Sequence, residues 1–183
     1  MTAAEGPRPC LPFRAVNRPG SAHYEPGLQR HHILPRQLQT RRFLARLLAS
    51  TGTGPMVFDD FRRNGVLLPA REDTAARLGL PLHRGPHHAY TAMVAERMGQ
   101  IEAAWALGRP GSPVSADCDA LFRLELLQRA LRRQLLDPPR RRLVLNRNDP
   151  VGTGVDFSML DAMADALWGG TQSVLATSSS LAA

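Results

Sequence analysis

Apolar side chains recur at helical spacing in two long stretches of the chain, and both stretches predict amphipathic helices. The first runs from about Tyr90 to Trp105, and Gly108 ends it. Its apolar face comprises Tyr90, Met93, Val94, Met98, Ile101 and Trp105. The second begins near Ser115, a good N-cap residue, and carries leucines at helical spacing until Pro138. Both stretches are therefore expected to be helical.

Shorter patterns predict further helices. The stretch from Gln37 to about Leu48 has leucines at helical spacing, and a Ser, Thr, Gly and Pro cluster at residues 50–55 ends it. One helical turn is expected from Asp73 to Leu78. A final short helix is expected from Ser158 to Trp168, because Ser158 and Asp161 form a capping-box pattern.

Extended segments are expected at three places. The run HHILP (31–35) is too short for a helix before its proline and favours a short strand. The runs MVFDDF (56–61) and GVLLP (65–69) predict two extended segments. Asn64 and Gly65 between them favour a hairpin turn, because both residue types tolerate positive φ. The fold class expected is α+β, mainly helical, with a small β core and flanking helices.

The same patterns divide the chain into four parts. Residues 1–27 are rich in Pro and Gly without a period, and they are expected to form an extended arm. Residues 28–108 form the core domain, residues 109–170 a helical extension, and residues 171–183 a flexible tail.

Composition points to an anionic partner. The formal net charge is +7, the sequence pI is about 11.0, and every basic residue is Arg. Such a balance favours nucleic acid before an acidic membrane. No stretch approaches a transmembrane span, so we expect a cytoplasmic protein without a membrane partner. Cys10 and Cys118 lie far apart, which argues against a disulfide framework, and Cys118 is expected to be a small core residue.

Five histidines lie in two clusters, His31 with His32 and, later, His83, His87 and His88. Adjacent residues of an extended segment point to opposite faces, so one of the first pair can face a metal ion while the other faces substrate. His83 and His87 would share a face on a helical turn. With His31 they would complete a three-nitrogen set with an open position. His32 would then be free to act as a base, since its unperturbed pKa is about 6.5.

Three segments together resemble a known family of nucleases. They are HHILP (31–35), NGVLLP (64–69) and HRGPHHAY (83–90), and their order matches that of the AHH family of the HNH/endonuclease VII superfamily. The most distinctive piece is an H-x-G-x-H-x-x-Y string formed by His83, Gly85, His87 and Tyr90. The resemblance covers roughly residues 28–100. It implies a small ββα-metal nuclease fold. Arg30 stands where the family name has Ala.

The resemblance also implies roles for individual residues. His31, His83 and His87 would hold one divalent ion, whether zinc, magnesium, manganese or nickel. The ion would polarise the scissile phosphate and stabilise the leaving 3′ oxygen. His32 would be the general base, and Asn64 would hold the loop or orient His32, because its amide both donates and accepts. Spacing alone leaves His88 open as an alternative ligand.

The function expected is therefore metal-dependent endonuclease activity, on DNA rather than RNA. Arg62 and Arg63 flank Asn64 and are the arginines best placed to meet phosphates, and Arg84 adjoins the second histidine cluster. Tyr90 is expected to serve the core, with its hydroxyl reaching the surface or a backbone group. Gly85 permits either a close approach of the backbone or a turn.

Other functions remain open on the sequence. One is a nuclease-type toxin or effector, which would have an immunity protein as its partner. A second is a non-catalytic nucleic-acid-binding protein with a structural metal site. A third is a helical interaction protein, since the apolar helices after residue 109 could cover the core or form a homodimer.

Overall fold

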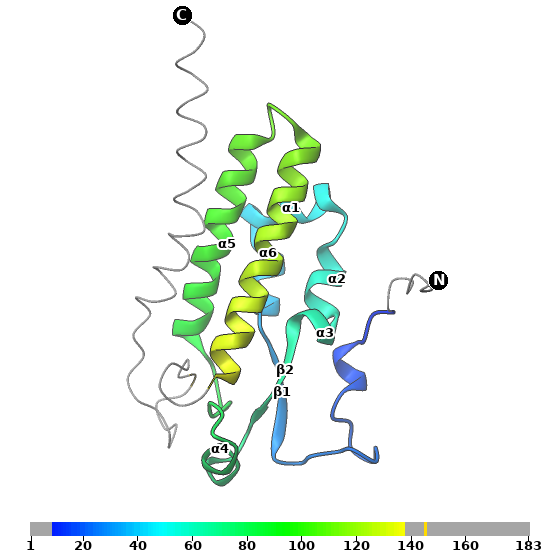
Figure 1. Cartoon of the computed structure of the whole chain (residues 1–183), viewed down its shortest axis with the longest axis vertical. Helices are drawn as coiled ribbons and strands as arrows, with labels where there is room; N and C mark the ends of the chain where they lie inside the picture. Colours follow the sequence, from blue (N-terminus) through cyan, green and yellow to red (C-terminus); the bar gives the residue numbers. More distant parts are fainter. Residues whose placement is uncertain (1–8, 138–144, 146–183) are drawn as a thin grey trace, which may run out of the picture. The chain divides into compact units, whose positions relative to one another are not determined.

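A two-stranded antiparallel sheet and the helices that cover it make up the described part of the chain, which is residues 9–137 and 145 of a computed structural model (Figure 1). These residues belong to one compact unit, Met1–Thr153. The expected helix from Ser158 to Trp168 lies outside them. The helical elements in chain order are η1 (Phe13–Ala15), η2 (Arg36–Thr40), α1 (Arg42–Thr51), α2 (Gly54–Asp59), α3 (Phe61–Asn64), α4 (Glu72–Leu78), α5 (His88–Gly108) and α6 (Pro113–Leu136). The expected class, α+β and mainly helical with a small β core, is confirmed.

The sheet consists of β1 (Leu28–His32) and β2 (Gly65–Pro69). Their register places His31 opposite Val66 and His32 opposite Gly65. Side chains alternate between the two faces of a strand, so His31 points away from the face that carries His32. The two adjacent histidine side chains therefore leave the strand in different directions.

Helices α5 and α6 pack side by side and form much of the core (Figure 1). The expected apolar face of α5 is buried from Tyr90 to Trp105, apart from the half-buried Met93. Helix α6 begins slightly earlier than expected, because Pro113 occupies its first turn and Ser112 caps it. Its buried residues include Ala116, Ala120, Leu124, Leu127, Leu131 and Leu135. Cys118, on the same helix, is exposed rather than part of the core.

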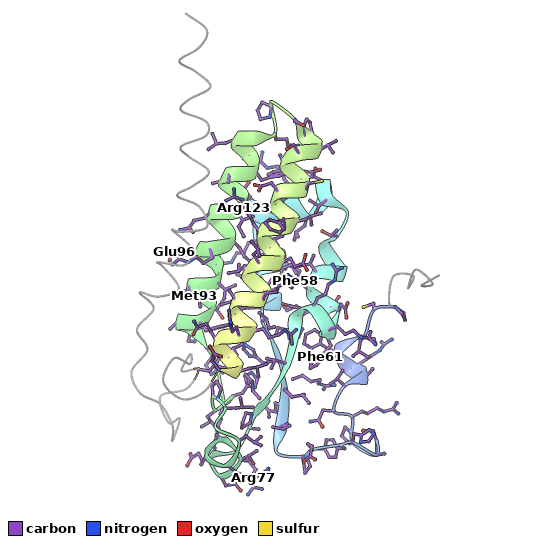
Figure 2. The ribbon with its side chains drawn as sticks, in the orientation of Figure 1. Phe58, Phe61, Arg77, Met93, Glu96 and Arg123 are labelled. Atoms are coloured by element: carbon purple, nitrogen blue, oxygen red, sulfur yellow. The ribbon has the colours of Figure 1, made fainter. Side chains whose placement is uncertain are left out.

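The prediction of an extended segment at residues 56–61 is wrong, and so is the prediction of a hairpin turn at Asn64 and Gly65. The first segment is helical, in α2 and α3, and the side chain of Asp60 caps α3 by accepting from the backbone N–H of Arg62 at 3.1 Å. Phe58 is buried on α2, and Figure 2 shows it with Phe61 on the neighbouring α3. A short apolar run fits a helix as well as a strand, and the Asp60 cap accounts for the start of α3 only.

The described residues of the expected N-terminal arm pack against this core. The backbone N–H of Phe61 donates to the carbonyl of Leu11 at 2.7 Å, and the N–H of Leu11 donates to Asp60 Oδ1 at 3.1 Å. The side chain of Asn17 then holds the turn that leads into β1 by donating to the carbonyls of Glu25 and Leu28. Within the described residues, no helix has both the length and the apolar character needed to cross a membrane.

Candidate metal centre and active site

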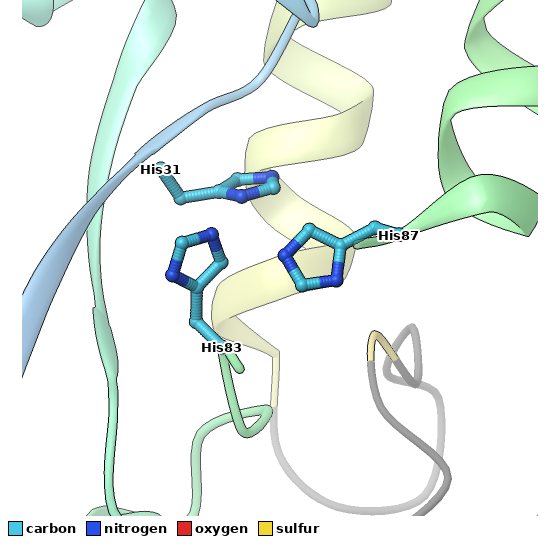
Figure 3. A group of neighbouring side chains, drawn as sticks. All are labelled: His31, His83 and His87. Carbon is cyan, nitrogen blue, oxygen red and sulfur yellow. The ribbon is translucent and has the colours of Figure 1, made fainter. Parts of the chain in front are cut away.

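Three histidine rings from separate segments converge beside the sheet (Figure 3). His31 comes from β1, His83 from the loop after α4, and His87 from the N-cap position of α5. One nitrogen of each ring lies within 4.8 Å of the others. The structure therefore brings together the three residues expected to hold a metal ion.

The loop between His83 and His87 lets both rings reach one point without a helical turn. These residues precede α5, so the helical arrangement expected from their spacing is wrong. The N–H of His83 donates to the carbonyl of Pro69 at 2.7 Å, which ties this residue to the end of β2. Gly85 has φ +78°, and a Cβ added there would meet nothing within 4 Å. Its role is therefore to make a turn, and no close approach requires it.

His31 has the chemistry of a neutral ligand. Its side chain is 4% exposed, and within the described part of the chain its Nε2 has no hydrogen-bond partner. Burial and, to a lesser extent, the neighbouring His83 and His87 lower its pKa to about 2. A buried nitrogen without a partner costs roughly 1–3 kcal/mol. A neutral imidazole in this position can offer a nitrogen lone pair to a metal ion.

Hydrogen bonds orient the other two rings. Nδ1 of His87 lies 3.0 Å from the carbonyl oxygen of Leu145, and Nδ1 of His83 lies 3.2 Å from Oε1 of Gln29. Both oxygens can only accept, so each Nδ1 carries the proton and each Nε2 keeps its lone pair. Such outer partners are the usual way to fix the tautomer of a metal-binding histidine.

The donor set fits a divalent ion. Ligand atoms of a tetrahedral ion bound at ~2.1 Å are roughly 3.4 Å apart, so the rings need only a small inward rotation from their 4.8 Å limit. Three neutral imidazoles suit zinc, nickel and other transition metals. Gln29 and Leu145 were not foreseen from the sequence. The signal for Gln29 was its place two residues before His31, on the same face of the strand.

His32 lies on the other face of β1, where its half-buried ring stacks on Phe13. The pKa of His32 is lowered, mainly by burial and next by the charge of Arg36, whereas Asp59 acts to raise it. The pKa of His83 is lowered to about 4 by burial, by His87 and by His32. The charge of His32 thus acts on His83 and on His31, although His32 is not part of the cluster.

Asn64 is fully buried and holds the loop that follows β1. Its Oδ1 accepts from the N–H of Leu34 at 2.6 Å, and its Nδ2 donates to the carbonyls of Leu34 at 3.0 Å and Phe58 at 3.1 Å. Nε2 of Gln128 on α6 donates to the same Oδ1 at 3.3 Å. Of the two roles expected for Asn64, these contacts correspond to holding the loop.

The hydroxyl of Tyr90 reaches the same loop. It donates to the carbonyl of Ile33 at 2.6 Å, so the expectation that Tyr90 is a core residue bonded to the backbone is confirmed. His88 is exposed and outside the candidate metal-binding group, and His23 is exposed as well.

The arginines expected to contact nucleic acid all lie on the surface. Arg62, Arg63 and Arg84 are exposed, and Nη1 of Arg62 donates to the carbonyl of Pro9 at 2.7 Å. Arg36 was missed from the sequence. It is exposed at the start of η2, and its charge acts on His32.

Three converging histidines beside a two-stranded sheet form a candidate divalent-metal centre, and comparison with known families shows where the chain belongs. The model of the AHH family, described as a nuclease family of the HNH/ENDO VII superfamily with conserved AHH, matches residues 13–111. The match covers more than half of the chain, so this chain belongs to the AHH nuclease family. No curated protein and no solved structure matches the chain significantly.

Proposed function

We propose that this protein is a metal-dependent endonuclease that hydrolyses phosphodiester bonds of DNA. His31, His83 and His87 hold the divalent ion, and His32 is the general base. The observation that carries the proposal is the convergence of one nitrogen each from the buried His31 and from His83 and His87 within 4.8 Å, in a chain of a nuclease family.

In this mechanism the bound ion supplies polarisation of the scissile phosphate and stabilisation of charge on the leaving 3′ oxygen. A nitrogen of His32 accepts a proton from the attacking water. The water oxygen bonds to phosphorus as the bond to the 3′ oxygen breaks, which leaves a 5′-phosphate and, after protonation, a 3′-hydroxyl. The lowered pKa of His32 keeps its ring neutral, and therefore basic, at neutral pH.

Surface arginines supply the binding energy for the phosphate backbone. The net charge of +7 favours a polyanion, and Arg62, Arg63 and Arg84 are exposed on the elements that flank the site. The charge of Arg36 acts on the proposed base, and Arg36 therefore joins this set in the proposal. Contacts of this kind orient the substrate but read no sequence.

The nuclease domain in this proposal includes the 28–108 core and the segment from residue 13, where the family match begins. Helix α6 belongs to the extension after residue 109 and covers the core. Gln128 of α6 bonds to Asn64, and Arg132 donates to the backbone carbonyl of Arg62 at 2.8 Å. Asn64 acts here as a positioning residue for the loop after β1.

The test is cleavage of supercoiled plasmid by the full chain with added Zn²⁺, Ni²⁺, Mn²⁺ or Mg²⁺, with and without a chelator. Nicking should require metal, and His32→Ala should abolish it while metal stoichiometry stays unchanged. His88→Ala is the matched control, because His88 adjoins the site but lies outside the cluster, and it should behave as wild type.

A second measurement addresses the ligands. The double variant His83→Ala with His87→Ala should lose bound metal in elemental analysis. Full activity of His32→Ala would overturn the mechanism, and unchanged metal content of the double variant would place the ion elsewhere. Cleavage of an RNA substrate in preference to the plasmid would overturn the assignment to DNA.

A further inference from the structure

We propose that Phe13 is the positioning residue of the general base. The inference rests on the proposed role of His32. The two rings lie face to face, with centroids 3.7 Å apart and an angle of 4° between their planes. In the described part of the chain, neither ring nitrogen of His32 has a hydrogen bond. The stack is therefore the contact that sets the plane of the imidazole ring, whose final torsion is otherwise loosely restricted.

The stack suits a general base because it leaves both ring nitrogens of His32 uncovered. Phe13 covers a face of the imidazole, while both nitrogens lie on the ring edge. His32 is half-buried, so this edge can meet water or substrate. A catalytic histidine is more often oriented through a hydrogen bond to one nitrogen, which leaves a single nitrogen for chemistry. Here an apolar contact performs the orientation.

Phe13 is itself held by a second aromatic ring. Phe61 meets it edge to face, with centroids 5.0 Å apart and planes at 73°. Gly65, the register partner of His32, makes room for this arrangement, because a Cβ at Gly65 would overlap the ring of Phe61. The φ of Gly65 is −111°, an ordinary extended value, so the glycine is required for space and not for backbone conformation.

The backbone around Phe13 is also anchored. Nη1 of Arg30 donates to the carbonyls of Phe13 at 3.0 Å and Val16 at 3.3 Å. Arg30 and His32 are two residues apart on β1, so they share the face on which Phe13 packs. Arg30 occupies the first position of the AHH motif, where the family has Ala. In this chain the Arg side chain thus helps to fasten the segment that positions the base.

The decisive variants are Phe13→Leu, which keeps an apolar side chain but removes the flat ring, and Phe13→Tyr, which keeps the ring. Phe13→Leu should lower kcat roughly 10- to 100-fold, because misplacement of a catalytic group by about 1 Å has an effect of that size. KM for plasmid DNA and the amount of bound metal should not change. Because Phe13→Tyr keeps the ring, its kcat should stay within about twofold of the wild-type value.

A spectroscopic measurement tests the contact without relying on activity. The ring current of Phe13 should shift the ring-proton resonances of His32 upfield, and Phe13→Leu should abolish this shift while Phe13→Tyr retains it. Arg30→Ala, which removes only the anchor at the surface, should reduce the shift in part. Identical His32 resonances in wild type and Phe13→Leu would overturn the inference.

A double-variant cycle separates this inference from the proposed function. If Phe13 acts through His32, Phe13→Leu should not change the residual rate of His32→Ala. A further loss in that background would overturn the positioning role. An inactive His32→Ala together with wild-type kcat in Phe13→Leu would overturn the inference alone, whereas a fully active His32→Ala would overturn the proposed function.

Discussion

Replacement of Asn64 tests whether one buried amide holds the loop that carries the site. Its side chain is 0% exposed, and the amide pairs with both backbone groups of Leu34 and with the carbonyl of Phe58. Asn64→Ala removes all of these partners at once. Because Leu34 follows β1 closely, the loss would also loosen the end of the strand that carries His31 and His32.

The expected magnitude follows from the groups left unpaired. The N–H and carbonyl of Leu34 and the carbonyl of Phe58 would each lose a buried partner, at about 1–3 kcal/mol per group. With partial relaxation we expect Asn64→Ala to lower the free energy of unfolding by about 3–5 kcal/mol. The free energy of unfolding of such a domain is ~5–15 kcal/mol, so the variant should lose a large part of its stability. Its unfolding should still be measurable at low temperature.

Asn64→Asp is the isosteric control for cavity formation. It keeps the side-chain shape and an acceptor for the N–H of Leu34, but it turns a carboxyl oxygen toward two carbonyls. Burial and these carbonyls should raise the pKa of the introduced carboxyl above the unfolded value of about 3.9. The loss of stability caused by Asn64→Asp should therefore be small below about pH 3.9, where the carboxyl is protonated in both states. It should grow as the pH rises above the unfolded pKa and become constant above the folded pKa.

The assay is urea unfolding at several pH values, followed by circular dichroism at 222 nm and by fluorescence, which includes that of the buried Trp105. Gln37→Ala, at an exposed position, should change the free energy of unfolding by less than about 0.5 kcal/mol. If Asn64→Ala and Asn64→Asp at pH 7 both fell within that range, the assignment of Asn64 as the anchor of the loop would be refuted.

Three smaller perturbations have equally definite outcomes. Tyr90→Phe removes the donor to a buried carbonyl of the same loop and should cost about 1–3 kcal/mol in thermal or urea unfolding, and no change would contradict that bond. Gln29→Ala frees Nδ1 of His83 and should weaken zinc binding at least ~10-fold in a competition titration, whereas wild-type affinity would argue against its orienting role. Gly65→Ala should displace the ring of Phe61 and cost about 1–3 kcal/mol in unfolding, and a neutral result would show that the ring yields freely.

Much of the helical architecture could be predicted because long amphipathic helices carry their signal locally. The face from Tyr90 to Trp105 and the leucines of α6 repeat with the helical period over several turns, and these side chains are buried against each other in the fold. The family could also be recognised, since its histidines fall in short motifs. The ligand chemistry of imidazole predicts His31, His83 and His87 as partners in one site, and the fold brings them together.

Tertiary contacts decided the parts that short patterns left ambiguous. Residues 56–61 are too few for periodicity to distinguish strand from helix, and in the fold they are helical with Val57 and Phe58 buried. The pair Asn64 and Gly65 has the composition of a hairpin turn, yet Asn64 pairs inside the core and Gly65 gives space to Phe61. Neither role has a local signature.

Residue types and their spacing fix which chemistry the chain can offer: histidines in two short motifs, an excess of arginine and enough apolar periodicity to build a helical core. The arrangement of that chemistry follows from tertiary contacts. The unpaired Nε2 of His31, the Gln29 contact to His83 and the stack of Phe13 on His32 all join residues distant in the chain or depend on burial. Such contacts arise from packing, which residue types and their spacing do not encode locally.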